Sequence, residues 1–126
     1  MMDTNLDSYE YLEVDATVIN LTDWDMDLVT SHLEWGKFDE GHSPISVPKK
    51  GKMSFTARGR SASPSGTEGY AVWTLKNHPE SPQIKAYFCN PAIGSSQADI
   101  ECKPNCISVS VKSGGGKKFV VTYIVG

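Results

Sequence analysis

Apolar and polar residues alternate with a period of two along most of this chain. Val14, Ala16 and Val18 alternate with Asp15, Thr17 and Ile19. Val109 and Val111 repeat the pattern near the other end of the chain. Because successive side chains of a β-strand point to opposite faces, this period predicts strands with one buried face. No segment shows the 3.6-residue period of a credible helix. The expected fold class is therefore all-β.

The alternation and the turn residues between apolar segments give the expected strands. They cover residues 14–20, 26–38, 45–47, 53–58, 70–75, 83–89, 107–112 and 119–125, with a bulge possible at Gly36. Residues 90–99 are expected to form a surface loop, and residues 114–116 the last hairpin turn. Seven to nine short strands at this spacing predict a single-domain antiparallel β-sandwich. The domain is expected to span residues 9–126, after a loose tail at residues 1–8.

Length and charge exclude several functional classes. The chain has 126 residues, a formal net charge of −3 and a pI near 5.5. Non-specific nucleic-acid binding needs a basic surface, and attraction to anionic lipids needs basic clusters. The acidic composition therefore argues against both. No segment approaches the ~18 apolar residues that would span a bilayer. The acidic N-terminus lacks the features of a signal peptide, so we expect cytoplasmic synthesis and release by a non-classical route.

The residues that support catalysis or metal binding do not form a recognised pattern. The histidines stand singly, and motifs for an activated serine or a phosphate-binding loop are absent. Asp23, Asp25 and Asp27 alternate and could hold a hard cation, but an acidic, solvent-facing turn is the favoured interpretation. We therefore expect no enzymatic activity, no metal and no cofactor.

Three cysteines do not indicate a disulfide framework in a chain of this kind. Cys102 and Cys106 could close a small loop, and either could reach Cys89. Cys89 ends an apolar strand, which favours a core or edge thiol over a nucleophile. The pairing of the three thiols stays open at this point.

A loop of small residues at positions 57–69 separates two apolar strands. It carries two guanidinium groups, from Arg58 and Arg60, and the carboxylate of Glu68. A charged loop of small residues between two strands is how a rigid β-scaffold presents a binding surface. The sequence therefore predicts that binding is centred here.

The tryptophans allow two interpretations. Trp35 and Trp73 are in phase with apolar neighbours, which favours burial, whereas Trp24 has an aspartate on each side and is expected to be exposed. An exposed indole or phenol suits a membrane interface or the face of a sugar.

Taken in order, several short blocks make the chain resemble the aegerolysins, from about Val14 to Val125. The blocks are Trp35-Gly36-Lys37-Phe38, Gly59-Arg60-Ser61, Gly66-Thr67-Glu68-Gly69, Tyr87-Phe88-Cys89-Asn90-Pro91 with Gly94-Ser95, and Val121-Thr122-Tyr123. The resemblance implies a β-sandwich that binds membrane lipids, typically sphingolipids in sterol-containing membranes. In several cases such a protein is the docking component of a two-component pore, with a partner of the membrane-attack-complex/perforin type.

The resemblance also implies a set of site residues. They are Trp35, Lys37, Arg60, Ser61, Ser65, Thr67, Glu68, Tyr87 and Ile93. Aromatic residues would enter the interface while Lys37 and Arg60 contact a headgroup phosphate; Arg60 could equally bridge loop carbonyls.

Three departures from the family pattern leave the lipid species open. Ser65 stands where lipid-binding members can carry an acid, Ala92-Ile93 replaces an aromatic residue, and Glu13 lies near the place of an early tryptophan in fungal members. The alternative is a lectin-like carbohydrate-binding or receptor-binding defence or toxin protein.

Overall fold

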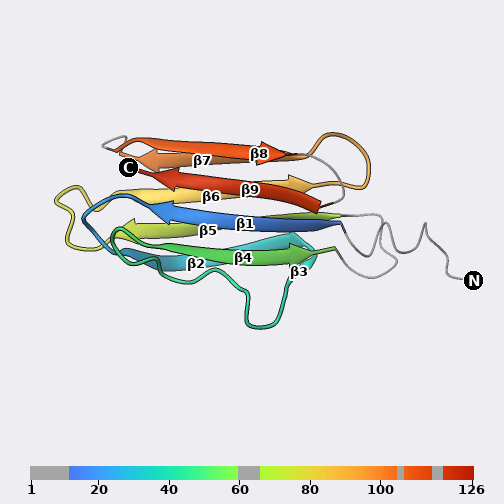
Figure 1. Ribbon diagram of the computed structural model, residues 1–126, viewed down its shortest axis with the longest axis horizontal. Coiled ribbons are helices and arrows are strands. Elements are labelled where there is room, and N and C mark those ends of the chain that lie inside the picture. The colour runs from blue at the N-terminus through green and yellow to red at the C-terminus, as the bar shows by residue number, and fades with distance from the viewer. Residues whose placement is uncertain (1–11, 60–65, 105–106, 115–117) are drawn as a thin grey trace, which may run out of the picture.

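Two β-sheets make up the part of the protein that the computed structural model describes, residues 12–59, 66–104, 107–114 and 118–126. The strands there are β1 (Glu13–Asn20), β2 (Met26–Trp35), β3 (Lys37–Phe38), β4 (Lys52–Arg58), β5 (Thr67–Leu75), β6 (Gln83–Asn90), β7 (Gln97–Lys103), β8 (Val109–Gly114) and β9 (Lys118–Val125). The five-stranded sheet has the order β3-β4-β1-β9-β8, and the four-stranded sheet the order β2-β5-β6-β7 (Figure 1). The predicted all-β sandwich is confirmed. One pairing, β1 with β9, is parallel.

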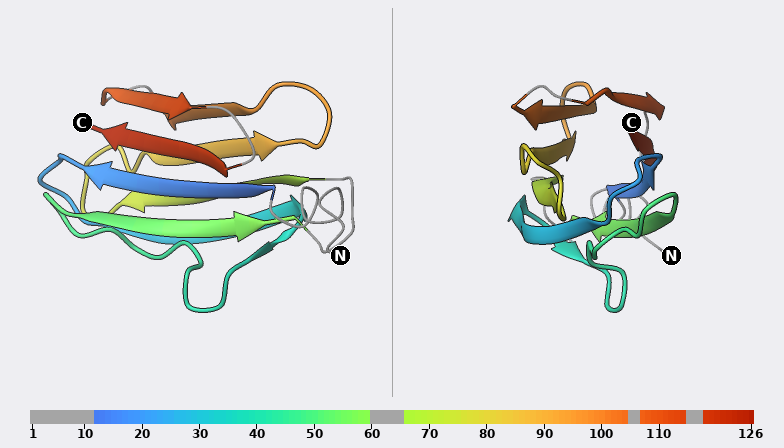
Figure 2. Two further views of the ribbon diagram at one scale, coloured as in Figure 1. Left: turned by 45° about the vertical axis from the view of Figure 1, so that its right-hand side comes forward. Right: turned by 90° about the vertical axis from the view of Figure 1, so that its left-hand side faces the viewer.

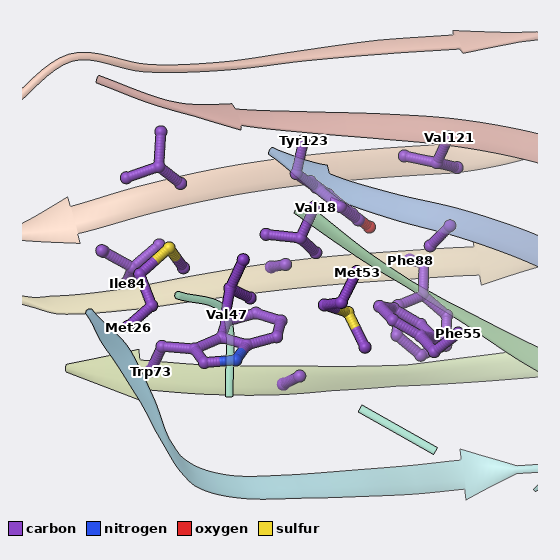
Figure 3. Close-up of a cluster of buried hydrophobic side chains, with 14 of the residues drawn as sticks. Val18, Met26, Val47, Met53, Phe55, Trp73, Ile84, Phe88, Val121 and Tyr123 are labelled. Carbon is purple, nitrogen blue, oxygen red and sulfur yellow. The ribbon is translucent and has the colours of Figure 1, made fainter. Parts of the chain in front are cut away.

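The inner faces of the two sheets form one hydrophobic core. Figure 3 shows Phe55 of β4 and Phe88 of β6 packed across it, with ring centroids 5.4 Å apart. Trp73 and Tyr123 are completely buried, and each uses its polar atom: the Trp73 Nε1–H donates to the Ile45 carbonyl at 2.8 Å, and the Tyr123 hydroxyl to the Tyr87 carbonyl at 2.6 Å. Side chains thus fill the interior of the sandwich.

The predicted strand at residues 26–38 is divided between the two sheets. β2 pairs with β5 in one sheet, whereas β3 pairs with β4 in the other. Gly36 makes the crossing with a φ of 96°, and a Cβ at this position would collide with the Arg58 carbonyl oxygen. Only glycine fits this backbone without strain, so the chain changes sheet here instead of forming a bulge.

Two other segments differ from the prediction. In residues 45–47, only Val47 pairs, through an isolated bridge to Met26. Residues 97–99, expected in a loop, begin β7, which pairs with β6 from Gln97 to Lys103. Its inward residues Ala98, Ile100 and Cys102 pack on the core, and its backbone pairs with β6 along its whole length.

None of the described residues lies in a helix long and apolar enough to cross a membrane.

Candidate functional site

The strands place most of the predicted site residues at one end of the sandwich. At this end β2, β4, β6 and β8 finish, and β1, β5, β7 and β9 begin (Figure 2). We call it the Trp35 end. Its described predicted residues are Trp35, Lys37, Thr67, Glu68 and Ile93, while Tyr87 lies three positions before the end of β6. Arg60, Ser61 and Ser65 lie outside the described residues, as do the predicted tail and Cys106.

Trp35 is the last residue of edge strand β2, and 46% of it is exposed. A register shift between Leu33 and Trp35 places the indole opposite Glu68, on the outer face of the four-stranded sheet. The alternative that Trp35 is buried is therefore wrong, whereas the same prediction for Trp73 is confirmed. Trp24, expected to be exposed, is half-buried, with its ring centroid 4.4 Å from that of His78.

Glu68 and Tyr87 form the polar centre of this face. The Tyr87 hydroxyl donates a 2.6 Å hydrogen bond to Glu68 Oε2. Burial, and then this bond to a carboxylate, raise the pKa of Tyr87 well above its usual value. Burial and the charge of Glu68 also raise the pKa of Cys89, which lies directly opposite Glu68 in β6. Cys89 is thus kept as a neutral thiol.

The Glu68 carboxylate has no basic partner among the described side chains, whose ion pairs lie elsewhere. It lies between an indole on β2 and a phenol on β6. Carboxylates and aromatic faces both attract cations, so this arrangement suits an ammonium group.

The same face continues with residues that sequence reasoning left out of the site. Tyr70, two residues after Glu68 on β5, has its ring centroid 5.6 Å from that of His32, and Lys85 Nζ lies 4.5 Å from the Tyr70 ring centre. Because alternate residues of a strand share a face, the signal that could have found Tyr70 is its spacing of two from Glu68. Beside this group, Lys85, Tyr87, Asp99, Ile100 and Glu101 line a shallow hollow of about 180 Å³.

Thr67 has a structural position. It is completely buried, and its hydroxyl donates a 2.6 Å hydrogen bond to the Leu12 carbonyl. Asn90, its partner in β6, donates to the Glu13 carbonyl at 2.9 Å. These two side chains join the sheets at the Trp35 end, so the Thr67 hydroxyl is not available to a ligand.

Ile93 is the second apolar side chain exposed at this end. It lies in the turn between β6 and β7, and 91% of it is exposed. Gly94 follows with a φ of 104°, which lets the turn reverse directly after Ile93. A branched aliphatic group is thus presented to solvent on the loop between β6 and β7.

The described basic residues at this end belong to the five-stranded sheet. Arg58 contacts Glu13 and Asp39, each at 2.9 Å, and Lys118 contacts Asp15 at 3.3 Å. Burial raises the pKa of Glu13; at Asp15 burial acts in the same direction but is outweighed by hydrogen bonds from Glu13, Thr56 and Lys118, which lower the pKa.

Lys37, opposite Arg58, is exposed and takes no part in these pairs. It therefore offers a cation at the rim of the Trp35 end.

Comparisons with known proteins agree on the fold. No family model and no curated protein sequence matches this chain. Several solved structures resemble it. The lipid-binding protein Nakanori is 14% identical, with a TM-score of 0.80 over 90% of this chain and 70% of its own. The RahU protein, solved with a Tris molecule, is 16% identical, with a TM-score of 0.72 over 92% and 96%.

The third structure is IP-1A from Alcaligenes faecalis, 19% identical, with a TM-score of 0.69 over 93% of this chain and 94% of its own. At such low identities these likenesses establish the fold alone: this chain shares its β-sandwich with a protein that binds lipid.

Proposed function

We propose that this protein is a membrane-lipid-binding protein of aegerolysin type that docks on bilayers through the Trp35 end. The observation that carries the proposal is the placement of two exposed apolar side chains, Trp35 and Ile93, at the same end as Glu68, whose carboxylate has no basic partner among the described side chains. A fold shared with a lipid-binding protein supports it.

Docking follows from the chemistry of this end. Tryptophan favours the membrane interface because its indole has an apolar body and a polar N–H, and Ile93 adds apolar area that the headgroup boundary can bury. Glu68 with its flanking rings would take the ammonium of a zwitterionic headgroup. Lys37 lies on the outer face of the other sheet, so it would contact the phosphate of a neighbouring lipid. Phosphocholine and phosphoethanolamine headgroups of sphingolipids have this pair of charges.

A pore would need a second protein. The core of the sandwich is filled by side chains such as Trp73 and Phe88, so the domain has no lumen of its own. We therefore propose a non-enzymatic docking role, with a perforin-type partner that inserts into the membrane, and release of this chain by a non-classical route.

Cosedimentation with vesicles tests the docking proposal. Phosphatidylcholine vesicles are compared with vesicles that also contain sphingomyelin or ceramide phosphoethanolamine, each with and without sterol. We expect the protein to sediment with at least one sphingolipid mixture, and failure with the whole panel would overturn the proposal.

The Glu68→Gln variant tests the headgroup contact. It exchanges a charge-assisted contact for a neutral one, a difference of about 1 kcal/mol, so the affinity should fall about fivefold. Glu101→Gln is the matched control, because Glu101 is on the same face but in β7 and away from the Trp35 end. Equal losses in both variants would contradict a specific role for Glu68.

A carbohydrate-binding function is the second candidate. The hollow of about 180 Å³ combines an ammonium donor from Lys85, carboxylate acceptors from Asp99 and Glu101, and the ring of Tyr87. Donors, acceptors and a ring are what a sugar with several hydroxyls requires. A glycan array separates the two functions: binding to soluble sugar without binding to protein-free vesicles would favour the lectin-like role.

A further inference from the structure

The net charge of −3 conceals an opposite charge on the two outer faces of the sandwich. The strand register assigns each side chain to a face. Among the described residues, the outer face of the five-stranded sheet has a formal charge of +2: Lys37, Lys52, Arg58, Lys112 and Lys118 against Glu13, Asp15 and Asp39. The described part of the outer face of the four-stranded sheet has a formal charge of −3: Asp27, Glu34, Glu68, Asp99 and Glu101 against Lys85 and Lys103.

The two faces point away from each other, as the end-on view in Figure 2 shows. We propose that the basic face of one copy docks against the acidic face of the next copy. The contact is heterologous, since each copy uses its basic face for one neighbour and its acidic face for the other. Copies joined in this way would form rows in which neighbouring sandwiches stack sheet against sheet.

The basic face has room for such a contact. Lys52 and Lys112 are exposed, and the described ion pairs of this face involve Arg58 and Lys118 instead. Between these lysines the face combines hydroxyl side chains, with a 3.1 Å hydrogen bond joining Thr17 to Ser54, and the aliphatic Ile19 and Ile124. None of these uncharged side chains repels the acidic face of a second copy.

Size and screening predict a weak, salt-sensitive contact. Four strands about 4.8 Å apart and about seven residues long cover roughly 450 Å², so two faces bury roughly 900 Å². Stable interfaces bury about 1,200 Å² or more, so the rows should be transient in solution. The Debye length falls from about 30 Å at 0.01 M salt to about 8 Å at 0.15 M, so association should weaken over that range.

This inference does not depend on lipid binding. The faces lie along the strands, whereas the Trp35 end lies at their tips. Glu68 and Lys37 belong both to the Trp35 end and to the charged faces, so lipid-bound protein would offer only the rest of each face for lateral contact. The test below contains no lipid.

Sedimentation velocity of the full chain at 0.01 M and 0.15 M salt tests the proposal. We expect the weight-average sedimentation coefficient to rise with concentration at low salt and to lose most of that rise at 0.15 M. Lys52→Glu/Lys112→Glu makes both faces acidic, and Asp99→Lys/Glu101→Lys makes both faces basic. Each variant alone should remain monomeric, with self-association reduced at least tenfold, and an equimolar mixture should associate again because opposite faces are restored.

Lys49→Glu/Lys76→Glu is the matched control, since it has the same net charge as the first variant but alters only loops. It should still associate more strongly than Lys52→Glu/Lys112→Glu. A monomeric wild-type protein at low salt, or equal loss in the face variant and the control, would overturn the proposal. Recovery on mixing also shows that both variants are folded.

Discussion

Replacing Trp35 by alanine tests whether the exposed indole anchors the protein in a membrane. A tryptophan side chain can bury about 250 Å², so the exposed 46% of Trp35 corresponds to roughly 115 Å². At about 25 cal/mol per Å², full insertion of this area contributes about 3 kcal/mol. Trp35→Ala should therefore weaken vesicle binding by up to about a hundredfold.

The assay is cosedimentation over a series of lipid concentrations, which does not depend on tryptophan fluorescence. Val29→Ala is the matched control: Val29 is 52% exposed on the same strand, but it lies six residues before Trp35, about 20 Å away. Its affinity for vesicles should be that of the wild type. Urea unfolding of Val29→Ala should change by less than about 1 kcal/mol. The buried part of Trp35, roughly 135 Å², contributes up to about 3 kcal/mol to folding, so circular dichroism must show that Trp35→Ala is folded under the binding conditions.

Two results would refute the reasoning. Unchanged binding of Trp35→Ala would mean that the indole stays outside the interface. Equal losses in the Trp35 and Val29 variants would mean that exposed apolar area, wherever it lies, determines the binding.

Three further changes are expected to have measurable effects. Ile93→Asp places a charge in the most exposed apolar position and should abolish vesicle cosedimentation while leaving the circular-dichroism spectrum unchanged. Thr67→Val leaves the buried Leu12 carbonyl without its partner and should lower the free energy of unfolding by about 1–3 kcal/mol, measured in urea; an unchanged value would argue against that bond. Cys89 has a raised pKa, so at pH 8 less of it is thiolate than in an unfolded chain, and alkylation by iodoacetamide, followed by peptide mass spectrometry, should be slower in the native protein and faster again in Glu68→Gln.

Most strands could be predicted because their alternation is local and strong. β1 and β9 bury every second side chain, and the apolar residues at those positions are large enough to show the period. β7 was missed because its inward residues include Ala98, and much of its stabilisation comes from the backbone bonds of β6, which leave no mark on its own sequence. Ile45 looks apolar enough for a strand, but its side chain is exposed, and within residues 45–47 only Val47 forms a β-bridge.

The different burial of Trp35 and Trp73 could not be predicted from the local sequence pattern. Both follow the same apolar phase, yet Trp73 lies on central strand β5 and is buried, whereas Trp35 ends edge strand β2 after a register shift. The number of neighbours that a strand has, and the shift that turns a side chain outward, are properties of the assembled sheet.

The amino-acid sequence by itself determined that this chain forms strands with one buried face, because each side chain's direction depends only on its neighbours in the chain. Only the tertiary structure decided that Trp35, Glu68 and Ile93 share one end, and that the charges separate onto opposite faces. Both depend on strand order and register, which pair residues far apart in the sequence and are selected by packing of the whole core.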